Sequence, residues 1–339
     1  MKIIARTGIA LLLIAAVAGG LGYYFVCYPN TQVDDEGVFY IREDDSFENV
    51  MENLQNNGYI KNSYTLRLVS RLKKYPEMVK SGRYRLKDGM NNNTLVNLLR
   101  SGNQEAVHFT FNNLRTLEQL AGVVSRQLEI DSLEFLETAR RPDLQRELGF
   151  TPETFIGMFI PNTYQVYWNT KPEKLIRKMA EEYRKFWNDT RLAEAKKAGL
   201  SPMEVITLAS IIEEETVRPE EHPVIAGVYI NRLNKNIPLS ACPTLKFALG
   251  DFTLKRILNK HMEIESPYNT YKNQGLPPGP IRMASVNVID AVLHYKKHDY
   301  LYFCAKSDFS GGHYFSKTLH QHNIYAKQYH RALNQRKIY

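Results

Sequence analysis

Apolar positions recur at helical spacing in the segment SPMEVITLASIIEEET, which runs from Ser201 to Thr216. At about 100° per residue, the apolar side chains between Val205 and Ile212 fill one broad arc of a helix. Ser201, Pro202 and Glu204 are typical of a helix start, because S-x-x-E can form a capping box and proline suits the first helical position. The pattern predicts a helix with one buried face that ends in three consecutive glutamates.

These three glutamates are predicted to project in different directions. Glu214 falls opposite the apolar arc, in solvent, whereas Glu213 and Glu215 fall inside its two edges, roughly 160° apart. A carboxyl group held against apolar neighbours loses solvation of its charged form, so its pKa rises and it can donate a proton near neutral pH. Cleavage of a glycosidic bond needs such a donor. The alternative is that the three glutamates only solvate a helix end, and this segment alone does not decide between the two.

A second apolar pattern lies near the N-terminus, where an uncharged run extends from Thr7 to Val26. A helix of about 20 residues spans about 30 Å, the thickness of a bilayer core. Lys2 and Arg6 precede the run, and acidic residues follow it between positions 34 and 45. The positive-inside rule then predicts a single-pass anchor in the cytoplasmic membrane, with the N-terminus in the cytoplasm and the remaining domains outside.

A cleaved signal peptide is the alternative interpretation, because residues 16–18 (Ala-Val-Ala) resemble a cleavage site. The apolar run continues beyond this site to Val26, which favours an uncleaved anchor. We therefore expect a cytoplasmic tip and transmembrane helix over residues 1–29.

The next unit, residues 30–104, has the pattern strand, helix, helix, strand and then a short helix. This β-α-α-β order, with Gly82-x-Tyr84 and a later Leu-Leu-x-x-Gly, resembles a LysM-like module of the kind that contacts peptidoglycan. A composition shift at residues 102–104 marks a boundary, and residues 105–339 alternate between strand and helix patterns. The predicted fold class is therefore α+β: a transmembrane helix, a small LysM-like module and a larger α+β catalytic domain.

Composition and charge narrow the function classes. The formal net charge of +8 suits an acidic surface such as a cell wall or anionic lipid headgroups. The basic residues are dispersed and no known nucleic-acid motif occurs, so a nucleic-acid partner is not expected. Three cysteines cannot form a disulfide framework, so stability must come from packing. No metal site or cofactor is expected, because His320 and His322 would point to different sides of a helix and no H-E-x-x-H sequence occurs.

A long segment between residues 266 and 281, SPYNTYKNQGLPPGPI, is dense in Tyr, Asn, Gly and Pro. This composition predicts a loop rather than the interior of a helix or strand. It suits a sugar site, since tyrosine faces can stack on rings while amides and backbone groups bond hydroxyls. A rigid connector is the alternative.

Several short motifs then occur in a recognisable order. They are LASIIEEET (208–216), INRL (230–233), CPT (242–244), YNTYKNQGLPPGPI (268–281), YLYF (300–303) and GGHYFSKTLHQHN (311–323). Their order and spacing resemble those of the MltG-type (YceG-like) endolytic murein transglycosylases. FIPNTY (159–164), the LysM-like unit and the single anchor also fit this family.

The resemblance implies cleavage of the β-1,4 bond between N-acetylmuramic acid and N-acetylglucosamine within peptidoglycan strands. It assigns the catalytic role to Glu213, which would protonate the glycosidic oxygen and then accept the proton of the muramoyl 6-hydroxyl, giving a 1,6-anhydro product. Glu215 is expected to orient a loop, and Asn231 and Arg232 either fix their helix or contact an acetamido group. The substrate-binding positions that the resemblance implies are Glu215, Asn231, Arg232, Thr244, Tyr268, Asn269, Thr270, Tyr271, Pro277, Pro278, Gly279 and His313. It also implies partnership with peptidoglycan synthases.

Two departures from the family pattern occur. The family usually carries L-Q-[ST/A]-D-P-T where this chain has Ser240 and Cys242 in place of the Gln and Asp, and Asn112-Asn113 replace an acidic-Gly pair. These changes keep a second hypothesis open, a catalytically weak scaffold that binds the wall. A third is a lysozyme-like hydrolase with Asp251 or Glu263 as the second carboxylate.

Overall fold

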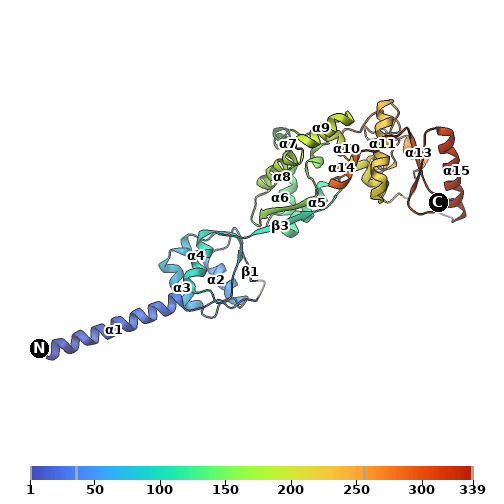
Figure 1. Cartoon of the computed structure of the whole chain (residues 1–339). Helices are drawn as coiled ribbons and strands as arrows, with labels where there is room; N and C mark the ends of the chain where they lie inside the picture. The colour runs from blue at the N-terminus through green and yellow to red at the C-terminus, as the bar shows by residue number, and fades with distance from the viewer. Residues whose placement is uncertain (1, 35–36, 255–256, 337–339) are drawn as a thin grey trace. The chain divides into compact units, whose positions relative to one another are not determined.

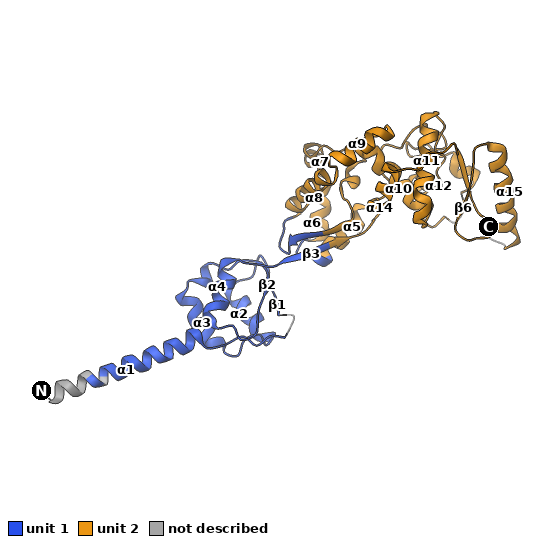
Figure 2. Ribbon diagram, in the orientation of Figure 1, with its two compact units in different colours: residues 1–109, 126–130, 164–171 blue, residues 110–125, 131–163, 172–339 orange. Residues whose placement is uncertain are grey.

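The computed structural model describes residues 2–34, 37–254 and 257–336, and the side chains of residues 2–8 and 10 lie outside the description. The chain forms two compact units (Figure 2). Unit 1 comprises residues 1–109, 126–130 and 164–171, and unit 2 comprises residues 110–125, 131–163 and 172–339. Both units combine helices with short strands, as the predicted α+β class requires. The predicted domain limits at residues 29/30 and 104/105 stay a prediction.

Unit 1 contains the predicted β-α-α-β order followed by a short helix (Figure 1). Strands β1 and β2 pair antiparallel, with Val38 opposite Arg85 and Ile41 opposite Gly82. The elements are β1 (Val38–Ile41), α2 (Phe47–Asn56), α3 (Ser63–Leu72), β2 (Gly82–Arg85) and α4 (Asn92–Ser101). Apolar side chains from all of them form one core, because each helix turns an apolar stripe toward the strand pair. The order of elements is confirmed, whereas the likeness to LysM modules stays a prediction.

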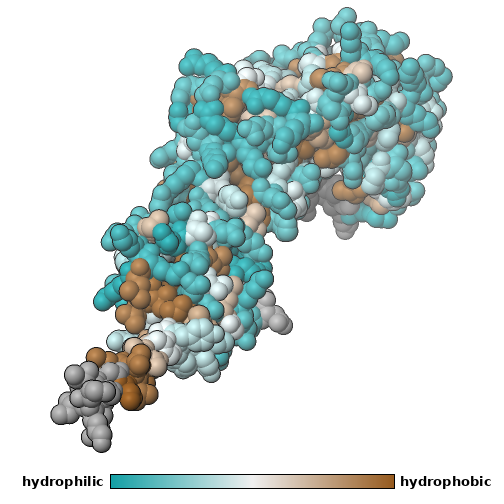
Figure 3. Space-filling view, turned by 60° about the vertical axis from the view of Figure 1, so that its left-hand side comes forward, coloured by the Kyte–Doolittle hydropathy of each residue, from teal (hydrophilic) through white to brown (hydrophobic). Residues whose placement is uncertain are grey.

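Helix α1 (Lys2–Cys27) precedes these elements. Apolar side chains of its described part are exposed, among them Ile9, Leu11, Leu12, Leu13, Ile14, Val17 and Leu21, and they form the brown surface at the end of the molecule in Figure 3. Within the residues that the structure describes, no helix has both the length and the hydropathy needed to cross a bilayer. The basic residues Lys2 and Arg6, and Thr7 at the start of the predicted anchor, have side chains outside the described part.

Unit 2 is built around helix α10 (Pro202–Glu215), which packs against α11 (His222–Asn234) and α14 (Val286–Leu293). The predicted capping box is confirmed: the Glu204 N–H donates to Ser201 Oγ (3.3 Å), and the Ser201 N–H donates to Glu204 Oε2 (2.7 Å). Every residue from Val205 to Ile212 is buried, so the prediction of a single apolar face was too narrow. Thr207 and Ser210 are tolerated inside because Ser210 Oγ donates to the Thr207 carbonyl and accepts from the Ile281 N–H.

The remaining elements of unit 2 surround this core. They include α6 (Ser132–Ala139), α7 (Pro142–Leu148), α8 (Pro172–Phe186), α9 (Asp189–Ala198), α12 (Cys242–Leu249), α13 (Asn259–Met262), β5 (Tyr302–Ala305), β6 (His313–Ser316) and α15 (Leu319–Gln335). Strands β5 and β6 form an antiparallel hairpin whose turn contains Gly311 in the left-handed region (φ 77°), and α15 follows it. Strand β3 (Ala106–Phe111) pairs with β4 (Asn162–Tyr167), and α5 (Leu117–Gln127) lies between them in sequence.

A buried asparagine in unit 1 generates a test of this packing. Asn92 Nδ2 donates to the Phe25 carbonyl (2.7 Å) and to Thr65 Oγ1 (3.1 Å), and its Oδ1 accepts from Asn30 (2.6 Å). We expect Asn92→Leu to lower the stability of unit 1 by about 1–3 kcal/mol, because buried polar partners lose their hydrogen bonds. Hydrogen exchange of unit 1 amides in the full-length chain measures this loss. Asn97→Leu, on the exposed face of the same helix, is the matched control, and equal protection in both variants would contradict the role of Asn92.

Candidate active site

The first of the three glutamates at the end of α10 joins two distant segments. The Asn113 side-chain amide donates to Glu213 Oε1 (2.7 Å), and the N–H and hydroxyl of Ser285 donate to Oε2 (3.0 and 2.8 Å). Glu213 therefore accepts three hydrogen bonds, from the segment after β3 and from the residue that precedes α14. This geometry suits a carboxylate that holds its neighbours in place.

The second glutamate corrects a prediction. Glu214 was expected in solvent, but only 17% of its side chain is exposed, because Arg115 and Arg282 cover it. Arg115 donates to both carboxylate oxygens, at 3.0 and 2.9 Å, and Arg282 forms an ion pair with one of them. Burial acts to raise the pKa of Glu214, but the two guanidinium groups outweigh it and the pKa lies below its usual value. The helical pattern could not reveal these arginines, because they come from segments about 100 residues before and 70 residues after it.

The third glutamate, Glu215, has the raised pKa expected of a carboxyl group held among apolar neighbours. Burial raises the pKa of Glu215 to about 7, although the hydrogen bond from the Tyr229 hydroxyl to its Oε1 (2.8 Å) opposes the shift. A carboxyl group with this pKa is partly protonated at neutral pH and can both donate and accept a proton. Lys246 and Arg232 are close enough to stabilise its charged form, and they also limit the shift.

Cys242 and Tyr271 lie in the same electrostatic neighbourhood as Glu215. The Cys242 sulfur lies 3.2 Å from the Tyr271 hydroxyl oxygen. Burial raises the pKa of both groups, and the Cys242 thiol raises that of Tyr271 further, whereas the hydrogen bond with Tyr271 opposes the rise at Cys242; thiol and phenol are both protonated at neutral pH. Cys242 is exposed and Tyr271 is half-buried, so this cluster can be reached from solvent.

Three residues predicted to contact substrate are buried and hold the loop that carries Tyr271. Asn269, Thr270 and Thr244 are at most 1% exposed, and their side chains are bonded to other parts of the protein. Asn269 donates to the carbonyls of Met262 and Ile264 (both 2.9 Å) and accepts from the Tyr271 N–H (3.0 Å). Thr270 Oγ1 accepts the Ala241 N–H (3.0 Å) and lies 2.8 Å from Thr244 Oγ1. These hydrogen bonds attach the loop of residues 266–281 to the start of α12, and this places Tyr271 beside Cys242.

Asn231 and Arg232 also hold structure, the first of the two roles that the sequence left open. Asn231 donates to the carbonyls of His298 (2.7 Å) and Tyr300 (3.0 Å). Arg232 donates to the carbonyls of Leu301 (2.6 Å) and Leu239 (2.8 Å). These bonds tie α11 to the segment before β5 and to the segment before α12.

The other predicted positions lie farther from the carboxylates or are buried. Tyr268 packs on Phe247 with ring centroids 4.7 Å apart. Pro277 and Gly279 are buried and Pro278 is exposed; a Cβ at Gly279 would collide with the Glu153 carbonyl, so this position requires glycine. The His313 side chain is 11% exposed, and its Nδ1 lies 2.7 Å from Glu221 Oε2, so it serves as an internal partner of that carboxylate.

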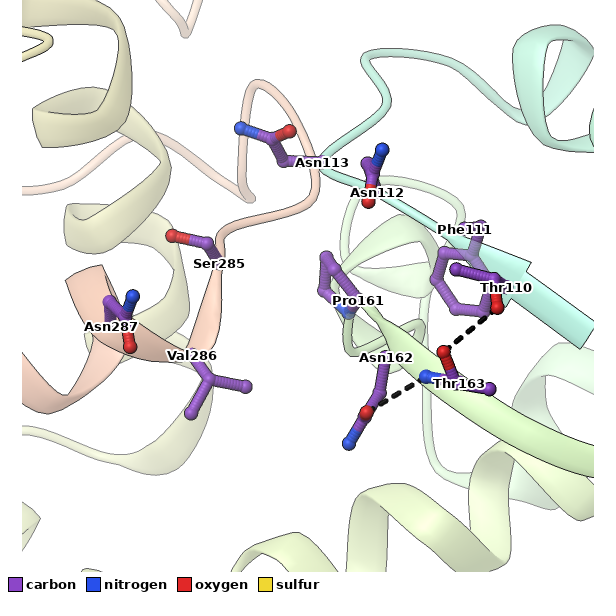
Figure 4. A pocket seen from close by; sticks show the side chains of 10 residues that line it. All are labelled: Thr110, Phe111, Asn112, Asn113, Pro161, Asn162, Thr163, Ser285, Val286 and Asn287. Carbon is purple, nitrogen blue, oxygen red and sulfur yellow. Dashed lines mark hydrogen bonds between the residues drawn. The ribbon is translucent and has the colours of Figure 1, made fainter. Parts of the chain in front are cut away.

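Asn113 and Ser285, the two partners of Glu213, line a cavity of about 450 Å³ (Figure 4). Three segments line it: residues 110–113, 161–163 and 285–287. The sequence alone did not reveal this site, although FIPNTY (159–164) and the Asn112-Asn113 pair lie in two of the segments. Ser285 could have been found only as a helix-cap residue, which gives no functional signal. In the described part of the chain, no three His, Cys, Asp or Glu side chains gather as a metal site would require.

The chain is similar to a known family and to several named proteins. A model of the YceG-like family matches residues 39–328. The endolytic murein transglycosylase of Bacillus subtilis (strain 168) is 34% identical over 272 residues, which are 76% of this chain and 74% of that protein. The endolytic murein transglycosylase of Streptococcus pneumoniae serotype 2 is 29% identical over 329 residues, and this chain spans only 59% of its length. A crystal structure described as a yceG-like protein from Listeria monocytogenes has a TM-score of 0.56 and 29% identity, covering 85% of this chain and 97% of that one.

The opposite pKa shifts of Glu215 and Glu214 predict opposite effects on stability. The pKa of Glu215 is higher in the folded chain than its ordinary 4.5, so the folded state loses stability as the pH rises from about 4.5 to about 7. We expect Glu215→Gln to remove this loss and to flatten the profile. The pKa of Glu214 is lowered, so its contribution is present at neutral pH and disappears on acidification.

Urea unfolding of the wild type and the two variants between about pH 3 and 7.5 measures this difference, because the Glu215 effect lies above pH 4.5 and the Glu214 effect below it. Glu214→Gln serves as the matched control on the same helix, with its largest destabilisation at neutral pH. Parallel profiles of unfolding free energy against pH for the wild type and both variants would contradict the opposite pKa shifts of Glu214 and Glu215.

Proposed function

Because the chain belongs to the YceG-like family, we propose that it is a lytic transglycosylase that cleaves peptidoglycan strands at internal bonds. The names of the relatives support the substrate and the reaction class. The observation that carries the proposal in this chain is the half-buried Glu215, whose pKa of about 7 suits an acid that must also act as a base.

In the proposed reaction, protonated Glu215 gives its proton to the oxygen that links C1 of N-acetylmuramic acid to the next sugar. The C1–O bond breaks and its electron pair stays with the leaving oxygen. The Glu215 carboxylate then accepts the proton of the muramoyl 6-hydroxyl, and O6 bonds to C1 to give the 1,6-anhydro product. No water is consumed and Glu215 regains its proton. Tyr271 and Cys242, both protonated, supply hydrogen-bond donors beside it.

Glu213, to which the sequence analysis assigned the acid, remains the alternative. Its position beside the cavity favours it, since a strand could approach there. However, its carboxylate already accepts three hydrogen bonds, and protonation would disrupt the bonds from Ser285 or Asn113. We therefore propose Glu215 as the acid and a positioning role for Glu213.

The proposal extends to location and partners. The exposed apolar side chains of α1 (Figure 3) favour insertion of this helix into the cytoplasmic membrane, with the N-terminus in the cytoplasm and the catalytic unit outside. The LysM-like unit would add contacts to the glycan strand, and peptidoglycan synthases are the expected protein partners, because newly made strands lie close to the membrane.

Digestion of uncrosslinked peptidoglycan strands tests the reaction and the acid together. We expect the full-length chain to release products with 1,6-anhydro-muramoyl ends, and Glu215→Gln to reduce the rate by about 10²- to 10⁴-fold, as removal of a general acid does. Glu213→Gln should reduce it by about tenfold or less, because the amide still accepts hydrogen bonds from Asn113 or Ser285. Mass spectrometry identifies the ends, and Glu134→Gln on the exposed face of α6 is the control.

Other outcomes of this experiment select other functions. A larger loss with Glu213→Gln than with Glu215→Gln would return the acid to Glu213. Products heavier by one water would indicate a hydrolase. No cleavage by the wild type would favour the scaffold hypothesis.

Cys242 stands where the family usually carries an aspartate, and this difference generates a separate prediction. Cys242→Asp would place a second carboxyl group beside Glu215, and repulsion between like charges should raise the pKa of Glu215 further. We expect the alkaline limb of the rate profile for strand cleavage to move to higher pH. Cys242→Asn, of similar size and without charge, should leave it in place. Superimposable profiles for the Asp and Asn variants would exclude direct coupling between positions 242 and 215.

A further inference from the structure

Helix α3 carries apolar side chains on both of its faces. Leu66 and Val69 are buried and belong to the core of unit 1. On the opposite face, Leu68 is exposed, and Tyr64 and Leu72 are 71% and 73% exposed. Because positions four apart lie one above the other on a helix, these three side chains form a stripe about 12 Å long, which we call the outer stripe of α3.

The start of α3 is bonded to the end of α1. Asn92 donates to the Phe25 carbonyl (2.7 Å) and to Thr65 Oγ1 (3.1 Å), and it accepts from Asn30. The Asn30 side chain also donates to the Asn62 carbonyl (2.9 Å) and accepts the Asn62 N–H (2.7 Å). Helix α1 packs against both α3 and α4. The first turn of α3 is thereby fixed beside the last turns of α1.

Exposed tyrosines surround this junction. Tyr23, Tyr24 and Tyr28 are exposed at the end of α1, and Tyr64 adds a fourth tyrosine from the outer stripe. Tyrosine favours the interface between a bilayer and water, because its ring is apolar and its hydroxyl needs a polar partner. In Figure 3, brown surface lies along α1 and again on the part of unit 1 next to its end. The hydrophobic surface of α1 therefore has a counterpart on unit 1.

The charges next to the outer stripe have one sign. Residues 60–75 contain no acidic residue and five basic residues, which are Lys61, Arg67, Arg71, Lys73 and Lys74. Arg67 forms an ion pair with Glu48, whereas Lys61, Arg71 and Lys74 are exposed. A helix face with apolar side chains among basic ones is attracted to a bilayer surface that contains anionic lipids.

A lipid surface fits these observations better than an acidic protein does. An acidic protein would match the basic side chains, but it would leave the position of the outer stripe at the end of α1 without a reason. A bilayer supplies apolar chains for Leu68 and Leu72, an interface for the tyrosines and anionic headgroups for Arg71 and Lys74.

We propose that the outer stripe of α3 lies in the headgroup region of an anionic bilayer and forms a second membrane contact beside α1. The inference rests on the proposed insertion of α1 for the position of the bilayer. One spanning contact and one interfacial contact, joined through Asn30 and Asn92, hold unit 1 in a single orientation on the membrane surface.

Tryptophan emission of the full-length chain in lipid nanodiscs tests this contact, because brominated acyl chains quench a tryptophan that touches them. In discs of equal parts brominated phosphatidylcholine and phosphatidylglycerol, Leu72→Trp should lose at least about half of its added emission relative to discs without bromine, since interfacial helices bury their apolar face. The wild type, with Trp168 and Trp187, gives the emission to subtract. Gln55→Trp, exposed on α2, is the matched control and should keep its emission.

Neutral variants test the role of charge. With Leu72→Trp as the reporter, Arg71→Gln combined with Lys74→Gln should reduce the quenching by about twofold in discs that contain phosphatidylglycerol. In discs of phosphatidylcholine alone, the same two substitutions should have little effect. Equal quenching of the reporter in both kinds of disc, with and without the substitutions, would overturn the preference for anionic lipid.

A reporter on α1 separates this inference from the proposed insertion. Leu12→Trp lies on the exposed surface of α1 and should be strongly quenched. Quenching at position 12 with none at position 72, or equal quenching at positions 55 and 72, would overturn the contact of the outer stripe and leave the insertion of α1 standing. Quenching at position 72 alone would overturn the insertion and leave the contact standing. Quenching at neither position would overturn both.

Discussion

Three consecutive carboxylates at the end of a buried helix impose the main constraint on unit 2. Successive side chains of a helix diverge by about 100°, so each glutamate needs its own set of partners. Glu213 takes them from Asn113 and Ser285, Glu214 from two arginines, and Glu215 from Tyr229. These hydrogen bonds and ion pairs bring segments between positions 113 and 285 together at one helix end, and both candidate sites lie there.

The same residue type consequently acquires three different chemical roles. Paired guanidinium groups keep Glu214 ionised, and three donors engage Glu213 as an acceptor. Glu215 is half-buried with a single hydroxyl partner, and burial raises its pKa to about 7. Differences in the number and charge of the partners, rather than in the side chain itself, give the three carboxyl groups different affinities for a proton or a hydrogen-bond donor.

Several residues of the family motifs donate side-chain hydrogen bonds to the backbone. Asn231, Arg232 and Asn269 direct their side-chain donors to main-chain carbonyls of loops that no regular hydrogen-bond ladder supports. Such loops would otherwise leave buried polar groups without partners. The result is a frame that holds Tyr271 beside Cys242, where the charge of Glu215 influences both groups.

The sequence by itself determined the elements and the family. Periodicity and capping signals located α10 and the β-α-α-β order of unit 1, because these depend on neighbours within a few residues. Only the tertiary structure decided what surrounds each glutamate. Arg115 and Arg282 cover Glu214, and Ser285 and Asn113 bind Glu213, from positions about 70 to 100 residues away. Burial and charge at a carboxylate depend on such distant partners, which no local pattern contains.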